Sequence, residues 1–198
     1  MTRTEFCQTI PHGHVNTMAD TVLVNASPED LRAILRNMLA SKTPGLVASF
    51  MKSTHARLQQ KVVQSSTPVE LVMAIGSDTP SPQLLEKLKS ARMLFGSGLG
   101  FSSLAPLAEV VRSTVNQRWD VDGEVSRVLA MADADIAQAI QSCKEQLLDP
   151  SQFIDLAGAQ RARTELLAAL RESQQDTGRW EGEFAFERGL YSVLDLKL

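Results

Sequence analysis

The 198-residue sequence has few cysteines, few aromatic residues and no long hydrophobic run. Its two cysteines, Cys7 and Cys143, lie far apart, and a secreted domain that depends on disulfides would normally carry more, so we expect two free thiols. No window reaches the ~18 consecutive apolar residues of a membrane span, and the N-terminus has no apolar run of signal-peptide length. These absences predict an intracellular protein, cytoplasmic or nuclear, with no membrane partner.

The scarcity of aromatic residues also indicates the fold class. Hydrophobic residues make up 43% of the chain but aromatic residues only 5%, so the core must consist mostly of aliphatic side chains and methionine, which suit helices. A chain of this length can bury roughly 70% of its surface in one core. The composition therefore predicts an all-α protein, a compact bundle of about seven helices.

Proline is used in a regular way. Five of the eight prolines stand in Ser-Pro, Thr-Pro or Asp-Pro pairs that we expect to start helices, because the side chain caps an N–H group and proline needs no donor at the first helical position. These pairs are Ser27-Pro28, Thr43-Pro44, Thr67-Pro68, Ser81-Pro82 and Asp149-Pro150. Together with the apolar periodicity they predict helices over 28–41, 44–64, 68–75, 82–95, 103–117, 122–148 and 150–173.

Two of these helices are long and follow one another. Apolar residues recur at steps of three and four from Val125 to Leu147, and the same pattern resumes from Phe153 to Leu170. The short connection at Asp149-Pro150 predicts a C-terminal αα-hairpin with antiparallel, neighbouring helices. In the helix over 28–41 the same periodicity predicts a buried face of Leu31, Ile34, Leu35, Met38 and Leu39.

The two ends of the chain differ from its middle. Residues 1–26 lack helical periodicity apart from a strand-like run at 21–24, which predicts an N-terminal arm, docked or disordered. Residues 27–176 form the predicted bundle domain. Residues 177–198 hold four of the ten aromatic residues and predict an extended segment with a short helix through Leu194, a C-terminal aromatic latch that packs on the bundle or on a second copy. Its candidate partner-binding residues are Trp180, Phe184, Phe186 and Tyr191.

No catalytic or metal-binding set is complete. His12 and His14, with Cys7 upstream, lack a fourth ligand at a recognisable spacing. The glycines at 96, 98 and 100 follow a predicted helix, whereas phosphate-binding glycines follow a strand, so they predict an interhelical turn. His55 has no facing nucleophile and reads as a surface histidine. We therefore expect no catalytic residue, no metal site and no cofactor.

A weak basic cluster is the best hint of a charged partner. No acidic residue occurs from Lys42 through Val69, and two arginines lie one turn apart on the preceding helix. Lys and Arg on one surface are what phosphate binding requires, although the net charge is −3 and no nucleic-acid-binding motif accompanies them. The candidate nucleic-acid-binding residues are Arg32, Arg36, Lys42, Lys52, Arg57 and Lys61.

Three functional hypotheses follow. The leading one is a non-enzymatic helical protein–protein interaction module that self-associates or binds another protein. The first alternative is a nucleic-acid or chromatin-associated factor that uses the basic residues of the first two predicted helices. The second is a small-molecule-binding bundle with a pocket among Met38, Met51, Met73 and Met93, although methionine at helical spacing is more often core filler.

Overall fold

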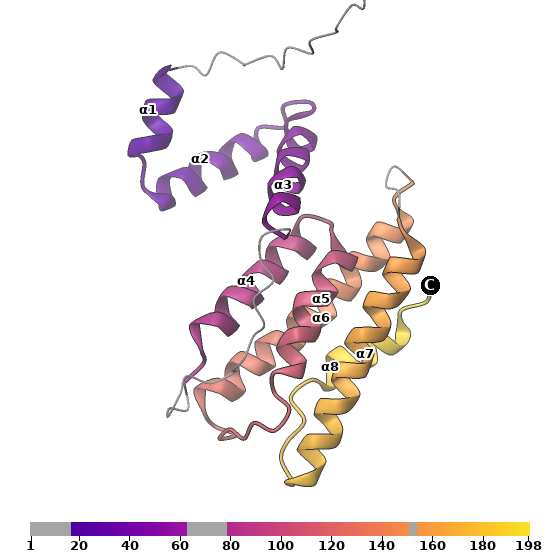
Figure 1. Ribbon diagram of the computed structural model, residues 1–198. Coiled ribbons are helices and arrows are strands. Elements are labelled where there is room, and N and C mark those ends of the chain that lie inside the picture. The colour runs from indigo at the N-terminus through magenta and orange to yellow at the C-terminus, as the bar shows by residue number, and fades with distance from the viewer. Residues whose placement is uncertain (1–16, 63–78, 151–153) are drawn as a thin grey trace, which may run out of the picture. The chain divides into compact units, whose positions relative to one another are not determined.

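The computed structural model describes residues 17–62, 79–150 and 154–198, and these residues form eight α-helices and no strand (Figure 1). The predicted all-α multi-helix bundle is thereby confirmed. The helices are α1 (Thr17–Asn25), α2 (Pro28–Ala40), α3 (Leu46–Val62), α4 (Pro82–Gly96), α5 (Gly100–Arg112), α6 (Glu124–Leu148), α7 (Leu156–Arg179) and α8 (Glu187–Asp195).

Two of the predicted caps start helices as expected. Ser27 accepts a hydrogen bond from the Asp30 N–H at the start of α2, and Ser81 accepts one from the Leu84 N–H at the start of α4. In each case proline occupies the first helical position, where its missing donor costs nothing. The helix predicted over 68–75, with its Thr67-Pro68 start, lies outside the described residues.

The other two predicted starts are wrong. Gly45, which follows Thr43-Pro44, has a left-handed φ of +76°, so α3 begins only after it, at Leu46. Asp149 has the extended backbone that a following proline favours, and α6 ends there. However, Asp155 occupies the N-cap position of α7, and the first backbone hydrogen bond of that helix runs from Ala159 N to Asp155 O at 2.8 Å.

The chain divides into two compact units, residues 1–50 and 51–198. In the first unit, the strand-like reading of residues 21–24 is wrong, because Thr17–Asn25 is helical and includes that run, whereas the N-terminal arm itself stays a prediction. A strand needs a neighbouring strand to complete its hydrogen bonds, whereas a helix completes them within itself. At the end of α1, Asn25 Nδ2 also donates to the Thr21 carbonyl at 2.7 Å. Residues 1–16 lie outside the described part.

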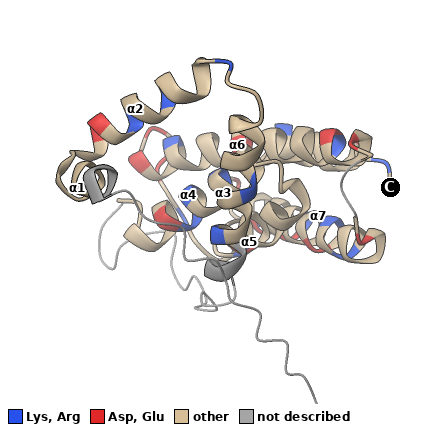
Figure 2. Cartoon of the chain, turned by 90° about the horizontal axis from the view of Figure 1, so that it is seen from above, with Lys and Arg blue, Asp and Glu red and all other residues tan. Residues whose placement is uncertain are grey.

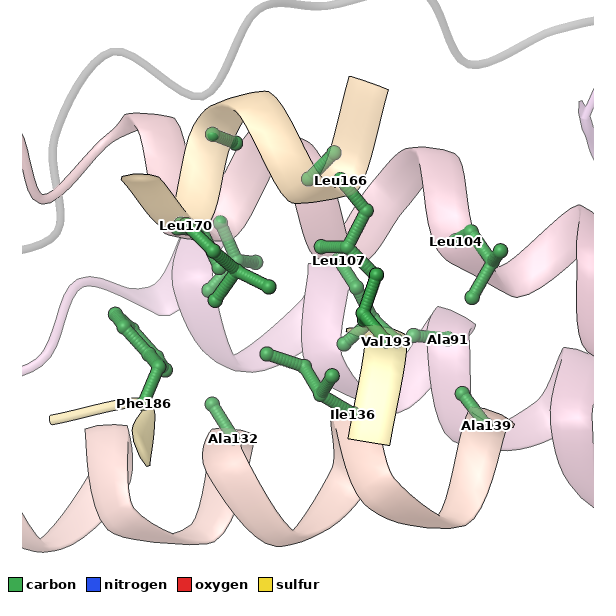
Figure 3. Close-up of a cluster of buried hydrophobic side chains, with 14 of the residues drawn as sticks. Ala91, Leu104, Leu107, Ala132, Ile136, Ala139, Leu166, Leu170, Phe186 and Val193 are labelled. Atoms are coloured by element: carbon green, nitrogen blue, oxygen red, sulfur yellow. The ribbon is translucent and has the colours of Figure 1, made fainter. Parts of the chain in front are cut away.

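The second unit is built around α5. This helix packs against α4, α6 and α7, and α8 packs against α6 and α7 (Figure 1). Seven of the thirteen residues of α5 are buried, which fits a central helix that has neighbours on several sides. Figure 3 shows how side chains from α4, α5, α6, α7 and α8 meet in one aliphatic cluster, which includes Ala91, Leu107, Ile136, Leu166 and Val193.

The sequence predicts that α6 and α7 are antiparallel neighbours. Both helices lie entirely within the described residues, and they do not pack side by side. Both are long helices with a short connection, as the sequence indicates, but α5 and α8 each contact both of them and therefore lie between them. The apolar stripe of α6, from Val125 to Cys143, packs into the common core instead of against α7 alone. The short connection between α6 and α7 therefore does not decide which helices pack against each other.

The C-terminal segment begins later than expected. Helix α7 continues through Arg179, past the predicted boundary at 176, and the chain then runs without helix until α8 begins at Glu187. Phe186, immediately before α8, is fully buried in the bundle core (Figure 3). The short helix at the end of the chain is confirmed, and it is an integral part of the second unit.

Candidate interaction surfaces

The most unusual surface lies on α2. Leu31, Ile34, Leu35 and Met38 recur at helical spacing on one side of this helix, which we call the α2 face. The expected burial of this side is wrong: no residue of α2 is buried, and the side chains of Ile34, Leu35 and Met38 are 42%, 42% and 46% exposed. Apolar residues at helical spacing normally form a face that packs against another structural element. The α2 face therefore has the pattern of an interface.

Helix α1 adds exposed apolar residues to the same unit. Val22, Leu23 and Val24 follow one another near its C-terminus, and each exposes more than half of its side chain. Three consecutive residues cover most of the circumference of a helix, so they extend the apolar character of the first unit without forming a single stripe. Residues 17–50 therefore present much more apolar side chain to solvent than a folded core would leave.

The charges of α2 are divided along its length. Glu29 and Asp30 lie in the first turn, where negative charge is favoured by the helix dipole, whereas the last turn holds no basic residue (Figure 2). Arg32 forms an ion pair with Glu29 at 3.1 Å, and both side chains are exposed. Lys42 follows the helix in a left-handed conformation with φ of 55°. The acidic residues of α2 thus lie at its start, and its basic residues, Arg32 and Arg36, lie in its middle.

The aromatic residues of the C-terminal segment mostly stabilise the bundle itself. Phe186 is fully buried, and Phe184 packs edge-on against it with ring centroids 5.9 Å apart. Trp180 packs edge-on against Trp119 at 5.6 Å. The prediction that Phe186 binds a partner is therefore wrong, because its side chain fills the core of its own chain. Of the four candidates, Tyr191 is the exposed one, at 71%.

Helix α8 has a second apolar side beside its buried one. Leu190 and Val193 face the core, whereas Tyr191 and Leu194, with Leu198 beyond the helix, are exposed. Two polar contacts hold α8 in place: the Asp133 carboxylate of α6 accepts from the Gly189 N–H at 2.6 Å, and Lys144 pairs with Asp195 at 2.7 Å. The exposed side of α8 therefore belongs to a helix that is fixed to the bundle.

The structure places the six basic candidates in both units. Arg32, Arg36 and Lys42 belong to the first unit and are exposed. Lys52 and Arg57 belong to the second unit and are also exposed. They are five residues apart on α3, which turns their side chains about 140° away from each other. The side chain of Lys61 lies outside the described part. Nucleic-acid binding through these residues stays a prediction.

Other candidate sites have local structural explanations. In the second unit, half-buried His55 forms a hydrogen bond through Nε2 with the carbonyl oxygen of Ser97, so it is not a freely exposed surface histidine. Gly98 provides a left-handed φ of +80° in the turn between α4 and α5, as the predicted interhelical turn requires. Cys143 is a free, buried thiol whose pKa burial raises to about 12. The other cysteine, Cys7, lies outside the described residues.

Two further predictions concern small ligands. Within the described residues, no group of three or more His, Cys, Asp or Glu side chains is placed to hold a metal ion, and His12 and His14 lie outside that part. Met38 and Met93 are 46% and 42% exposed and belong to different units. Met73 is outside the described residues. Met51 is partly buried and belongs to the second unit together with Met93, so none of the three described methionines is fully buried, and the methionine-lined pocket stays a prediction.

None of the helices, over the residues that were described, is both long enough and apolar enough to cross a membrane. Comparisons of the chain with protein-family models, with curated proteins and with solved structures found no match.

Sequence reasoning assigned the α2 face to the core, and of the exposed side of α8 it named only Tyr191. Both surfaces left a signal in the sequence. Helix α2 combines a strong apolar stripe with the absence of any aromatic residue. Helix α8 carries apolar residues on more than one side in only nine positions, which is more than a single packing face needs.

Proposed function

We propose that this chain is a non-enzymatic helical interaction module that self-associates through the α2 face. The observation that carries the proposal is the exposure of the α2 face on a helix of which no residue is buried. Fully burying a Leu, Ile or Met side chain contributes about 1.5–3 kcal/mol. Three nearly half-exposed side chains, Ile34, Leu35 and Met38, together with the partly exposed Leu31, can therefore drive an association of useful strength.

Two further features support this proposal. The second unit has its own continuous core from α4 to α8, so the bundle needs nothing from the α2 face in order to fold. The free thiol of Cys143 fits the reducing interior of a cell, where we place the module. A stable bundle that carries an exposed apolar helix is the arrangement expected of a scaffold with a separate binding element.

The test compares two leucines with nearly equal exposure. Leu35 on α2 is 42% exposed and Leu85 on α4 is 47% exposed. Sedimentation equilibrium over a wide concentration range should show a monomer–dimer equilibrium for the wild-type chain and for Leu85→Glu, and a monomer for Leu35→Glu. If the wild-type chain is monomeric throughout, self-association is refuted. If Leu35→Glu associates as strongly as Leu85→Glu does, the α2 face is not the interface.

A further inference from the structure

We infer that the C-terminal segment with α8 is exchangeable between two copies of this chain, so that each copy seats the α8 of the other. The exchanged segment is 184–198, and the hinge is formed by residues 181–183. The inference goes beyond the proposed function, because the α2 face takes no part in the exchange. It rests on how α8 is seated in the bundle and on the conformation of the hinge.

The seat of α8 is formed by α6 and α7. These two helices do not pack side by side, and α8 contacts both of them. Phe186 and Val193 are fully buried in the common core (Figure 3), and Phe184 and Ala185 pack against that core. The same contacts form when the segment belongs to a second copy, because the surfaces that meet are identical. Exchange therefore loses no buried apolar area.

Polar contacts at both ends of α8 fix its direction and register. Three groups of the seat each meet a group of the exchanged segment. The pairs are the Asp133 carboxylate with the Gly189 N–H at 2.6 Å, Arg163 Nε with the Val193 carbonyl at 3.2 Å, and Lys144 with Asp195 at 2.7 Å. All three re-form in an exchanged dimer only if α8 enters in the same orientation. The seat thus accepts α8 of a second copy and discriminates against other amphipathic helices.

The hinge adopts a conformation that glycine favours. At the end of α7 the Gly182 N–H donates to the Thr177 carbonyl at 3.1 Å, which is the closing bond of a Schellman motif. Glycine is usual at the left-handed position of this motif, but here Glu181 occupies it with a φ of 57°. A left-handed backbone is unfavourable for a residue with a side chain. An extended hinge avoids this conformation, so exchange relieves it once in each of the two chains.

Trp180, directly before the hinge, adds to the cost of the closed form. Its indole Nε1 is buried and has no hydrogen-bond acceptor among the described residues. A buried donor that lacks an acceptor is unfavourable, because it has lost its bond to water. The hinge backbone lies against the same ring: a Cβ atom at Gly182 would overlap the six-membered ring of Trp180. When the hinge opens, the indole becomes accessible to water.

The strength of the exchanged dimer follows from the hinge, because the seat of α8 is the same in both forms. A short link gives the chain's own α8 an effective concentration in the millimolar range. Relief of a left-handed residue favours the open hinge about fivefold, and two hinges contribute to each dimer. We therefore expect a dissociation constant on the order of 0.1 mM.

Cross-linking of mixed chains tests the exchange. All chains carry Cys7→Ser and Leu35→Glu, so that the α2 face does not associate, and the remaining native thiol, Cys143, is buried with a raised pKa that suppresses the thiolate. One chain adds Lys144→Cys, on the seat, and the other adds Asp195→Cys, on α8. The two chains are refolded together from urea above the expected dissociation constant and are then treated with a short bismaleimide.

Exchange predicts a covalent dimer from the mixture, because residue 144 of one chain then lies beside residue 195 of the other. Each chain refolded alone should give only traces of dimer. The chain that carries both cysteines, refolded at high dilution, should link within itself, which shows that the cross-linker spans the two positions. A mixture without covalent dimer, together with efficient linkage within the double variant, would overturn the inference.

These outcomes are independent of the proposed function. In the native protein α8 leaves its seat slowly, because its buried side chains must first leave the core, so chains that are never unfolded report on the α2 face alone. Absence of the cross-link leaves the sedimentation test of Leu35→Glu unchanged. A native wild-type chain that is monomeric refutes association through the α2 face and leaves the exchange after refolding to its own test.

Two hinge variants should move the exchanged dimer in opposite directions, as sedimentation after refolding measures. Glu181→Gly accepts the left-handed conformation and should weaken the dimer at least about fivefold. Gly182→Ala opposes the closed turn, because its Cβ meets the Trp180 ring, and should strengthen the dimer. The control is Gly178→Ala, whose Cβ meets nothing within 4 Å and which should leave the dissociation constant unchanged. Equal dimer yields for the two hinge variants would show that the hinge does not drive the exchange and would overturn the inference.

Discussion

Asp133 on α6 accepts a hydrogen bond from the backbone N–H of Gly189 at 2.6 Å, so a carboxylate of one helix caps the N-terminus of another. Helix α8 lacks a side-chain cap of its own, because its N-cap residue is Phe186. Gly189 allows this close approach: a Cβ atom there would lie 2.9 Å from Asp133 Oδ1 and 2.9 Å from Ile136 Cγ2. The docking of α8 thus depends on one glycine and one acid that are 56 residues apart.

The stability of the protein should depend on pH through Asp133. Burial raises the pKa of its carboxyl above the usual 3.8, and the N–H groups of Gly189 and Arg188 oppose that rise only in part. The folded chain therefore holds this proton more tightly than the unfolded chain does. The contribution of Asp133 to the free energy of unfolding is thus greatest below pH 3.8 and is lost as the pH rises through the raised pKa.

Urea unfolding of the wild-type chain and of Asp133→Asn between pH 3 and pH 7 measures this dependence. Asparagine keeps an acceptor for Gly189 and does not titrate, so the stability of the wild-type chain relative to the variant should fall with rising pH and then become constant. Asp133→Ala removes the acceptor and should lower the free energy of unfolding by about 1–2 kcal/mol at pH 7. A relative stability that rises with pH would contradict the assignment.

Replacing Gly100 should destabilise the bundle. A Cβ at this position would lie 2.4 Å from the backbone nitrogen of Cys143, so Gly100→Ala must push the start of α5 away from α6. Such overpacking costs about 1–3 kcal/mol. The matched control is Gly178→Ala in α7, where a Cβ meets nothing within 4 Å and helix propensity should raise stability by up to about 1 kcal/mol. Equal stability of the two variants in urea unfolding would refute this role of Gly100.

The buried hydroxyl groups of Thr114 and Ser173 should act as a unit. Their oxygens are 2.8 Å apart, and they join the turn that follows α5 to α7. Thr114→Val should lower the free energy of unfolding by about 1–2 kcal/mol, because it leaves the buried Ser173 hydroxyl without its partner. Ser173→Ala should cost less, because the Thr114 hydroxyl still donates to the Val111 carbonyl at 2.7 Å. The double variant should lose less than the sum of the two single losses. Additive losses in a double-mutant cycle would show that the two groups are not coupled.

The α2 face and the bundle core should respond differently to substitution. In dilute, monomeric protein, Leu35→Glu should change the free energy of unfolding of the second unit by no more than about 0.5 kcal/mol, because Leu35 is exposed and lies outside that unit. Leu170→Ala, at a fully buried position, should lower it by about 2–5 kcal/mol. Tryptophan fluorescence during urea unfolding measures both. A large loss with Leu35→Glu would show that the α2 face contributes to the fold.

Sequence reasoning succeeded where neighbouring residues decide the outcome. The capping pairs at Ser27 and Ser81 start helices at the expected positions, and the end of α6 before Pro150 was placed correctly. Each depends on hydrogen bonds and steric limits within a few residues. The start of α3 was misplaced because the left-handed conformation of Gly45, immediately after Pro44, was not considered.

Sequence reasoning failed where the outcome depends on residues far apart in the chain. The apolar stripes of α2 and α6 have the same period, yet the stripe of α6 is buried and the α2 face is exposed. Phe186 and Tyr191 are both aromatic residues of one short segment, but the first lies in the core and the second in solvent. Periodicity and composition indicate that a side chain can be buried, and they do not indicate whether another element covers it.

The sequence by itself determined that the chain is all-helical, where several helices begin and end, and that its core is aliphatic, because these properties follow from local hydrogen bonding and side-chain chemistry. Only the tertiary structure decided that α5 and α8 lie between α6 and α7, that Asp133 caps α8, and that no residue of α2 is buried. These features are set by contacts between residues far apart in the chain, and the competition among such contacts is resolved only when the whole core packs.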